Sequence, residues 1–231
     1  MNRRVSDDLI RFPELSERLK TVLKLEESPV GVKLIKVGEK LPSIAEPENP
    51  ISYCASIARA RKGETILMGK DKHICKLGAA NLGLIALPET ITSGKSHAGI
   101  IFKSTDAASK TISQIPRIEE GIVQATLVFP LENAPVDPDV IIVSVNPING
   151  LWMALSLDYT FGGRVSSSFA GIGGTCGDAT ALPYLTNKPN FSVGDFGGRK
   201  NKSPDDIIVG LPAALLEEVV NNLEKLPVNK K

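Results

Sequence analysis

The sequence predicts an α/β protein made of two similar βαβ-rich halves related by an approximate two-fold axis, with a mixed sheet and an extra N-terminal helix. Apolar runs of strand length alternate with amphipathic segments of helix length. The run 139–145, DVIIVSV, is apolar at almost every position, which is typical of a strand covered by helices on both faces. The order of elements also occurs twice, over about residues 29–115 and 138–223.

Each element is expected from its hydrophobic period and from the proline or glycine that ends it. Residues 6–26 are expected to form the extra N-terminal helix, interrupted at Pro13 because proline lacks an amide hydrogen. The other expected helices are 51–62, 76–87, 106–115, 149–161, 179–185 and 213–226. The expected strands are 29–37, 64–69, 97–103, 122–129, 139–145, 164–171, 191–200 and 206–212.

The two proposed copies share signals beyond the order of their elements. Each copy has Asn-Pro just before its first helix, and each has a glycine about a dozen residues before a cysteine, Cys75 or Cys176. A genuine repeat would bring these two cysteines into equivalent places near the axis and form one shared pocket. We therefore expect a single α/β domain over residues 1–231.

Composition limits the classes of partner. The chain has 231 residues, 42% of them hydrophobic, with 27 Lys and Arg against 26 Asp and Glu. This balance produces no general attraction to nucleic acid or to an anionic membrane, so neither is expected as a partner. The sequence shows no secretory signal and no bilayer-spanning segment, and a cytoplasmic location is expected. Three cysteines spaced far apart do not indicate a disulfide framework.

The glycine-rich segment GIGGTCGD, residues 171–178, carries Cys176 to the start of an expected helix. Glycines allow backbone amides to approach a bound group closely, and a helix start favours negative charge. The predicted ligand-binding residues here are Gly173, Gly174, Thr175 and Asp178. Because a helix start lowers the pKa of a thiol, Cys176 is a candidate reactive thiol or metal ligand.

The leading hypothesis is that Cys54, Cys75 and Cys176 converge on one metal site. Three thiolates cannot complete a closed zinc site, which takes four ligands. They could hold an iron–sulfur cluster with one iron left open, or a metal completed by His73. The alternative is that at least one of these cysteines is packed in the core as a small hydrophobic residue.

Two other functions stay open on the sequence alone. In the first, Arg164 and Arg199 lie beside glycine turns and clamp an anionic small molecule or nucleotide, without metal. In the second, the protein is a cysteine-dependent enzyme with Cys176 as nucleophile and Asp178 as the nearby base. The sequence contains no GxSxG elbow of the hydrolase type.

Several motifs resemble a known family, the prokaryotic domain of unknown function 169, also called ArCR. They are PVGVKL, a cysteine before ARARKGE, HICKLGAANLGL, PDVIIVSVNP, GTCGDATALP, VGDFGGRK and a late IIVGLP. The resemblance extends from about Pro29 to Leu226 and implies a self-contained α/β protein, common in archaea and anaerobic bacteria. That habitat favours iron–sulfur chemistry, but the resemblance implies no particular reaction and no catalytic residues.

The partners expected from these hypotheses are a small-molecule ligand or a redox partner. A homo-oligomer also stays open, because the small-residue helix from Leu77 to Leu87 would suit close packing either within the chain or against a second copy.

Overall fold

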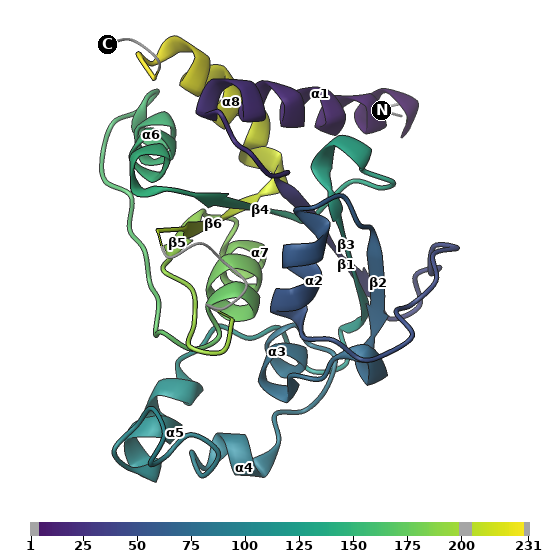
Figure 1. The fold of residues 1–231 in the computed structure, drawn as a ribbon, viewed down its shortest axis with the longest axis vertical. Coiled ribbons are helices and arrows are strands. Elements are labelled where there is room, and N and C mark those ends of the chain that lie inside the picture. Colours follow the sequence, from purple (N-terminus) through teal and green to yellow (C-terminus); the bar gives the residue numbers. More distant parts are fainter. Residues whose placement is uncertain (1–4, 199–204, 229–231) are drawn as a thin grey trace.

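The structure is a computed structural model that describes residues 5–198 and 205–228, and one six-stranded sheet forms its centre (Figure 1). The strands are β1 (Val30–Lys36), β2 (Ile66–Gly69), β3 (Val123–Pro130), β4 (Val140–Val145), β5 (Asn190–Ser192) and β6 (Ile207–Pro212). The α-helices are α1 (Val5–Leu23), α2 (Tyr53–Ala60), α3 (Lys76–Asn81), α4 (Glu89–Thr92), α5 (Thr105–Ser113), α6 (Pro147–Asp158), α7 (Leu182–Thr186) and α8 (Leu216–Lys225). The shorter helical segments are the 3-10 turns η1 (Lys70–Lys72), η2 (Leu131–Asn133) and η5 (Ala213–Leu215), and the π-helix η3 (Gly174–Ala181).

The strands lie in the order β2-β3-β1-β4-β6-β5, and every pairing among these strands is antiparallel. The α/β class is therefore confirmed, whereas the predicted mixed sheet of βαβ units is wrong. A βαβ unit returns the chain parallel to its first strand, but here each neighbour in the sheet runs the opposite way. On the central strand β1, Val30 lies opposite Pro130 of β3 on one side and Ile142 of β4 on the other.

The predicted two-fold relation between the halves is not shown. The strand order does read alike from its two ends, β2-β3-β1 and β5-β6-β4. The first helix after the leading strand of each half, however, packs on opposite faces of the sheet. Tyr53 and Ile57 of α2 join the core on one face, and Met153 of α6 joins the core on the other. A rotation that matches the strands would not match these helices.

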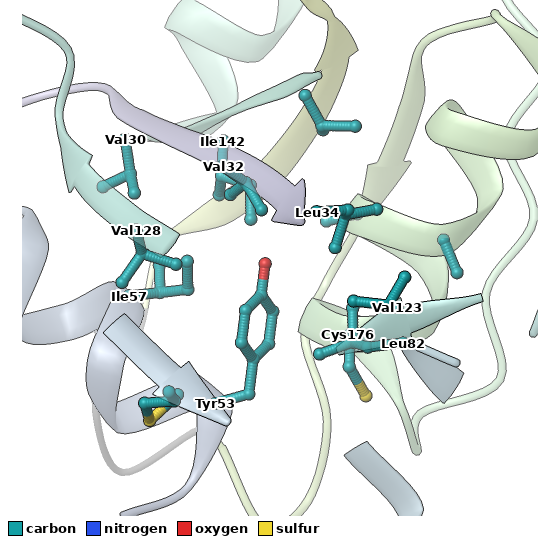
Figure 2. Packing of buried hydrophobic residues seen from close by; sticks show 14 of the residues in the cluster. Val30, Val32, Leu34, Tyr53, Ile57, Leu82, Val123, Val128, Ile142 and Cys176 are labelled. Atoms are coloured by element: carbon teal, nitrogen blue, oxygen red, sulfur yellow. The ribbon is translucent and has the colours of Figure 1, made fainter. Parts of the chain in front are cut away.

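Each face of the sheet has its own hydrophobic core. The first core joins α2, α3 and η3 to Val32 and Leu34 of β1, and Figure 2 shows the Tyr53 ring standing within it, with its hydroxyl end toward these strand residues. The second core joins α1, α6 and α8 to β4 and β6, through residues such as Ile141 and Val209. Burial of both faces explains why 139–145 is apolar at successive positions.

The π-helix η3 lies against β6 at unusually short range. A Cβ atom added to Gly210 would meet the backbone oxygen of Ala179 at 2.2 Å, which is too close for any side chain. The glycine on β6 therefore lets η3 rest directly on the strand backbone. This contact positions the segment that carries Cys176.

Two predicted strands are absent from the structure. Residues 97–103 form turns, in which the carbonyl of His97 accepts the amides of residues 100, 101 and 102, and Gly99 has a φ of 76°. They belong to a small lobe with α4 and α5, drawn away from the sheet in Figure 1. Residues 164–171 form no strand and are mostly exposed, and the backbone of Ser168 pairs with the side chain of Asn190 on β5 rather than with a strand backbone. Apolar alternation alone therefore overpredicts strands here.

The extra N-terminal helix is present as α1, but the predicted interruption at Pro13 is wrong because the helix continues through this residue. The turns after Pro13 bury Leu15, Leu19 and Leu23 in the second core, and this packing offsets the missing amide hydrogen bond. None of the helices in residues 5–198 and 205–228 combines the length and the apolar character that crossing a bilayer requires.

Candidate functional site

One pocket of about 430 Å³ is lined by all three cysteines of the chain. It lies between α2, α3, the start of η3, the lobe around α4 and the turn at 195–198. We call it the cysteine pocket. Its lining is formed by Ser52, Tyr53, Cys54, Ile74, Cys75, Lys76, Leu77, Gly78, Ile91, Ser96, His97, Ile101, Ile172, Gly173, Cys176, Asp195, Phe196, Gly197 and Gly198.

Each cysteine reaches the pocket from the start of a different helix. Cys54 lies in the first turn of α2, next to the N-cap Ser52, and is half-buried. Cys75 is exposed and caps α3, where its sulfur accepts the amide hydrogen of Gly78 at 3.4 Å. Cys176 is buried in the first turn of η3. None of the three forms a disulfide.

Glycines on two helices bring the sulfur atoms toward one another. A Cβ atom added to Gly78 would meet the Cys75 sulfur at 3.6 Å and the Cys176 sulfur at 3.8 Å, so these two sulfurs face the same glycine of α3. A Cβ atom added to Gly174 would meet the backbone of Gly194 at 2.5 Å. The small-residue helix thus packs within the chain, against η3, and the turn at 195–198 is held close behind Cys176.

A polar side chain lies against the Cys176 sulfur, and it comes from a residue that the sequence analysis did not single out. Asn81, at the end of α3 and fully buried, donates from Nδ2 to the Cys176 sulfur at 3.4 Å. Its Oδ1 accepts a hydrogen bond from Nε of Arg117 at 3.3 Å. Asparagine has a low helix propensity, so its presence in an expected helix of small apolar residues was the sequence signal that could have pointed to a role for Asn81.

The surroundings of Cys176 disfavour the ionisation of its thiol. Burial raises the pKa of Cys176 well above its usual value, and the nearby Cys54 and Cys75 raise it further, whereas the Asn81 hydrogen bond lowers it. The predicted lowering of this pKa by a helix start is therefore wrong for the structure, because desolvation outweighs it. A Cys176 thiolate in this buried place would be stabilised by a compensating positive charge.

The Asp195 carboxylate is hydrogen-bonded to three parts of the pocket wall. Its Oδ2 accepts the amide hydrogen of Thr175 at 3.4 Å and the thiol hydrogen of Cys54 at 3.9 Å, and its Oδ1 accepts the amide hydrogen of Gly198. The carboxylate thus joins α2, η3 and the turn at 195–198 at the pocket wall.

The outer part of the pocket is mainly apolar. Its walls include Leu77, Ile91, Ile101 and Ile172, and two of its hydrophobic side chains, Ile74 and Phe196, are largely exposed. The polar groups there are Lys76, Ser96 and His97, and the last two are hydrogen-bonded through Nδ1 at 2.7 Å. An apolar chamber with a few polar groups is the usual form of a small-molecule site. The sequence analysis placed His97 only at the start of an expected strand, 97–103, so its place on this wall was missed.

Of the residues predicted from the glycine-rich segment, some lie at the cysteine pocket and one does not. Gly173 lines the cysteine pocket, and Gly174 and Thr175 lie directly behind it. Asp178 is buried one turn further on, where it accepts a hydrogen bond from Ser192 at 3.0 Å and does not reach the pocket wall. Burial raises the pKa of Asp178 to about 7.

Of the two predicted arginines, Arg164 does not line the cysteine pocket. Arg164 is exposed and lines a separate depression with residues that include Phe161 and Lys188. Arg199 lies outside the described residues.

His73 does not complete a site with the cysteines. It is buried beneath Tyr53, its ring stacked at a centroid distance of 6.4 Å, and its Nε2 shares a hydrogen bond of 3.2 Å with Thr126. It is not part of the pocket wall, and burial lowers its pKa to about 4. Within residues 5–198 and 205–228, no three His, Cys, Asp or Glu side chains are grouped closely enough to hold a metal ion.

Comparison with known proteins identifies relatives of this chain without assigning a function. The chain is 32% identical over 223 residues to an uncharacterised protein, MJ0308, of Methanocaldococcus jannaschii, and the match covers 94% of this chain and 95% of that protein. No solved structure matches the present chain. The model of the family described as uncharacterised ArCR, the domain of unknown function 169, matches residues 18–222. The chain therefore belongs to the ArCR family, domain of unknown function 169.

Proposed function

We propose that the protein binds an iron–sulfur cluster through Cys54, Cys75 and Cys176. One observation carries the proposal: cysteines far apart in the sequence, on three different helices, all line one pocket. Cysteines buried merely as small hydrophobic residues have no reason to gather at one exposed cavity. The shared pocket therefore supports a role of the three cysteines as ligands.

A cluster fits this arrangement better than a single ion. A single zinc ion needs its thiolates within about 2.3 Å of one point, and the described residues offer no such group. A cluster contains several iron and sulfide atoms, so its thiolates stand further apart around it. Three cysteines that line one pocket from three different helices suit this larger occupant.

The electrostatics of the pocket also favour a cationic occupant. Burial raises the pKa of Cys176, and Cys54, Cys75 and Asp195 raise it further, so ionisation of this thiol is costly without positive charge. Iron ions supply that charge and convert a repulsive group into ligands. The Asn81 donor on the Cys176 sulfur is the kind of outer partner that thiolate ligands have.

When bound, such a cluster supplies electron transfer or, at an iron without a protein ligand, Lewis acidity. The chain itself contributes the apolar outer part of the cysteine pocket. Apolar walls exclude water from a small molecule, and His97 and Lys76 are available to hold its polar end. A small-molecule substrate or a redox partner follows from this proposal.

The two alternatives have less support. A metal-free anion site would use Arg164, which lies in a different depression, whereas the described lining of the cysteine pocket includes the carboxylate of Asp195 and no arginine. A thiol enzyme would need Cys176 activated by Asp178. The pKa of Cys176 is raised instead, and the Asp178 carboxylate accepts a hydrogen bond from Ser192.

The test is purification of the full chain without oxygen, followed by iron and acid-labile sulfide analysis and a visible spectrum of the same sample. We expect a brown protein with stoichiometric iron and sulfide and a broad absorption band in the blue region. A colourless protein that takes up no iron during anaerobic reconstitution, and whose three thiols are all alkylated, would contradict the proposal.

A further inference from the structure

Asn81 and Arg117 form a buried pair beside the Cys176 sulfur. Asn81 is fully buried and uses both ends of its side-chain amide, one toward Arg117 and the other toward the sulfur. Arg117 is half-buried, and its Nη2 also donates to the carbonyl of Ile112 at 3.4 Å. The guanidinium is thus held in place from two directions.

This pair determines which way the Asn81 amide points. The oxygen and nitrogen of an asparagine side chain are distinguished by their hydrogen-bond partners. Arginine has only donors, so the group that faces Arg117 must be the amide oxygen. The NH₂ group must then face Cys176. Without Arg117 the amide could turn over and present its oxygen to the sulfur, which is repulsive for a thiolate.

We propose that Arg117 and Asn81 are positioning residues that hold an N–H donor on the Cys176 sulfur and thereby raise the reduction potential of the bound cluster. The proposal rests on the cluster proposed above. Asn81 and Arg117 would not ligate iron themselves and would act through the Cys176 thiolate.

The direction of the effect follows from charge. Reduction adds an electron to the cluster, and the thiolates carry part of that added negative charge. A donor hydrogen bond to a thiolate stabilises the more negative state, so the reduction potential rises. The positive charge of Arg117 acts in the same sense, because arginine stays protonated in proteins.

The test is a redox titration of the anaerobically purified protein, followed by electron paramagnetic resonance. Asn81→Leu removes the donor at similar volume, and its midpoint potential is expected to be more negative than that of the wild type. Asn81→Asp keeps an acceptor for Arg117 but places a carboxylate beside Cys176, so its potential is expected to be lower still. Arg117→Gln should shift the potential in the same direction by a smaller amount. Retention of iron is expected to fall by roughly 10- to 100-fold in the Asn81 variants.

A matched control is Asn222→Leu. Asn222 is also buried and donates from its side chain to a backbone carbonyl, that of Ser156, on the other face of the sheet. This variant is expected to lose stability and leave the potential unchanged. Unchanged potentials in both Asn81 variants, with the cluster present, would overturn the positioning role alone. A wild-type protein without a cluster would overturn the proposed function, and this inference with it.

Discussion

Replacing Cys176 with serine is expected to abolish retention of iron and sulfide in anaerobically purified protein. Cys176 is the buried member of the three cysteines, and its sulfur faces both the pocket and the Asn81 donor. Serine keeps the size of the side chain but is a poor ligand for iron in a cluster. The loss should exceed the roughly 10- to 100-fold effect of removing an outer partner of a ligand. Iron and sulfide analysis measures it directly.

Ala181→Ser is the matched control for this substitution. Ala181 is fully buried on the same π-helix but does not line the pocket, so the variant adds the same hydroxyl without removing a thiol. It is expected to keep its iron even if it loses some stability. Cys54→Ser and Cys75→Ser should also lose iron. Wild-type iron content in a folded Cys176→Ser protein would remove this residue from the site.

Gly210→Ala is expected to be strongly destabilising. The added methyl group would meet the backbone oxygen of Ala179 at 2.2 Å, and a backbone cannot swing aside as a side chain can. The π-helix would have to lift from β6, at a cost near the upper end of overpacking effects, about 3 kcal/mol in the free energy of unfolding. For a chain of this length that corresponds to a fall in Tm of about 6 to 12 °C, measured by thermal denaturation.

Gly150→Ala controls for the change of residue type. Gly150 lies inside α6, where the nearest atom to an added Cβ, Ile207 Cδ1, is 3.4 Å away. Alanine is better than glycine in a helix by about 1 kcal/mol, so this variant should be as stable as the wild type or slightly more stable. Equal Tm values for Gly210→Ala and the wild type would show that η3 does not rest on β6 as described.

The sequence predicted the elements of the fold better than their arrangement. Residues 139–145 and 206–212 were expected as strands and form β4 and β6, because their apolar runs report burial on both faces. The antiparallel direction of the strands and the opposite placement of α2 and α6 depend on contacts between distant segments. No local period carries that information. The false strand at 97–103 arose because Ile101 and Phe102 pack within a small lobe rather than in a sheet, while Ile100 is largely exposed.

The candidate site was predictable where residue chemistry is distinctive. Cys54, Cys75 and Cys176 were grouped because thiols are rare in this chain, and the structure brings them to one pocket, while their role as ligands stays a prediction. Asn81 and Arg117 were missed because amide and guanidinium side chains are common. Only the folded chain reveals which sulfur they serve.

The central claim is that Cys54, Cys75 and Cys176 would hold one iron–sulfur cluster in which one iron has no protein ligand. Mössbauer spectroscopy of protein grown on ⁵⁷Fe and purified without oxygen tests it most directly, because it distinguishes irons by their ligands. The account predicts a cluster spectrum in which one iron differs from the others and changes when a small ligand is added. An absence of cluster iron, or a cluster whose irons are all equivalent and insensitive to added ligand, would contradict it.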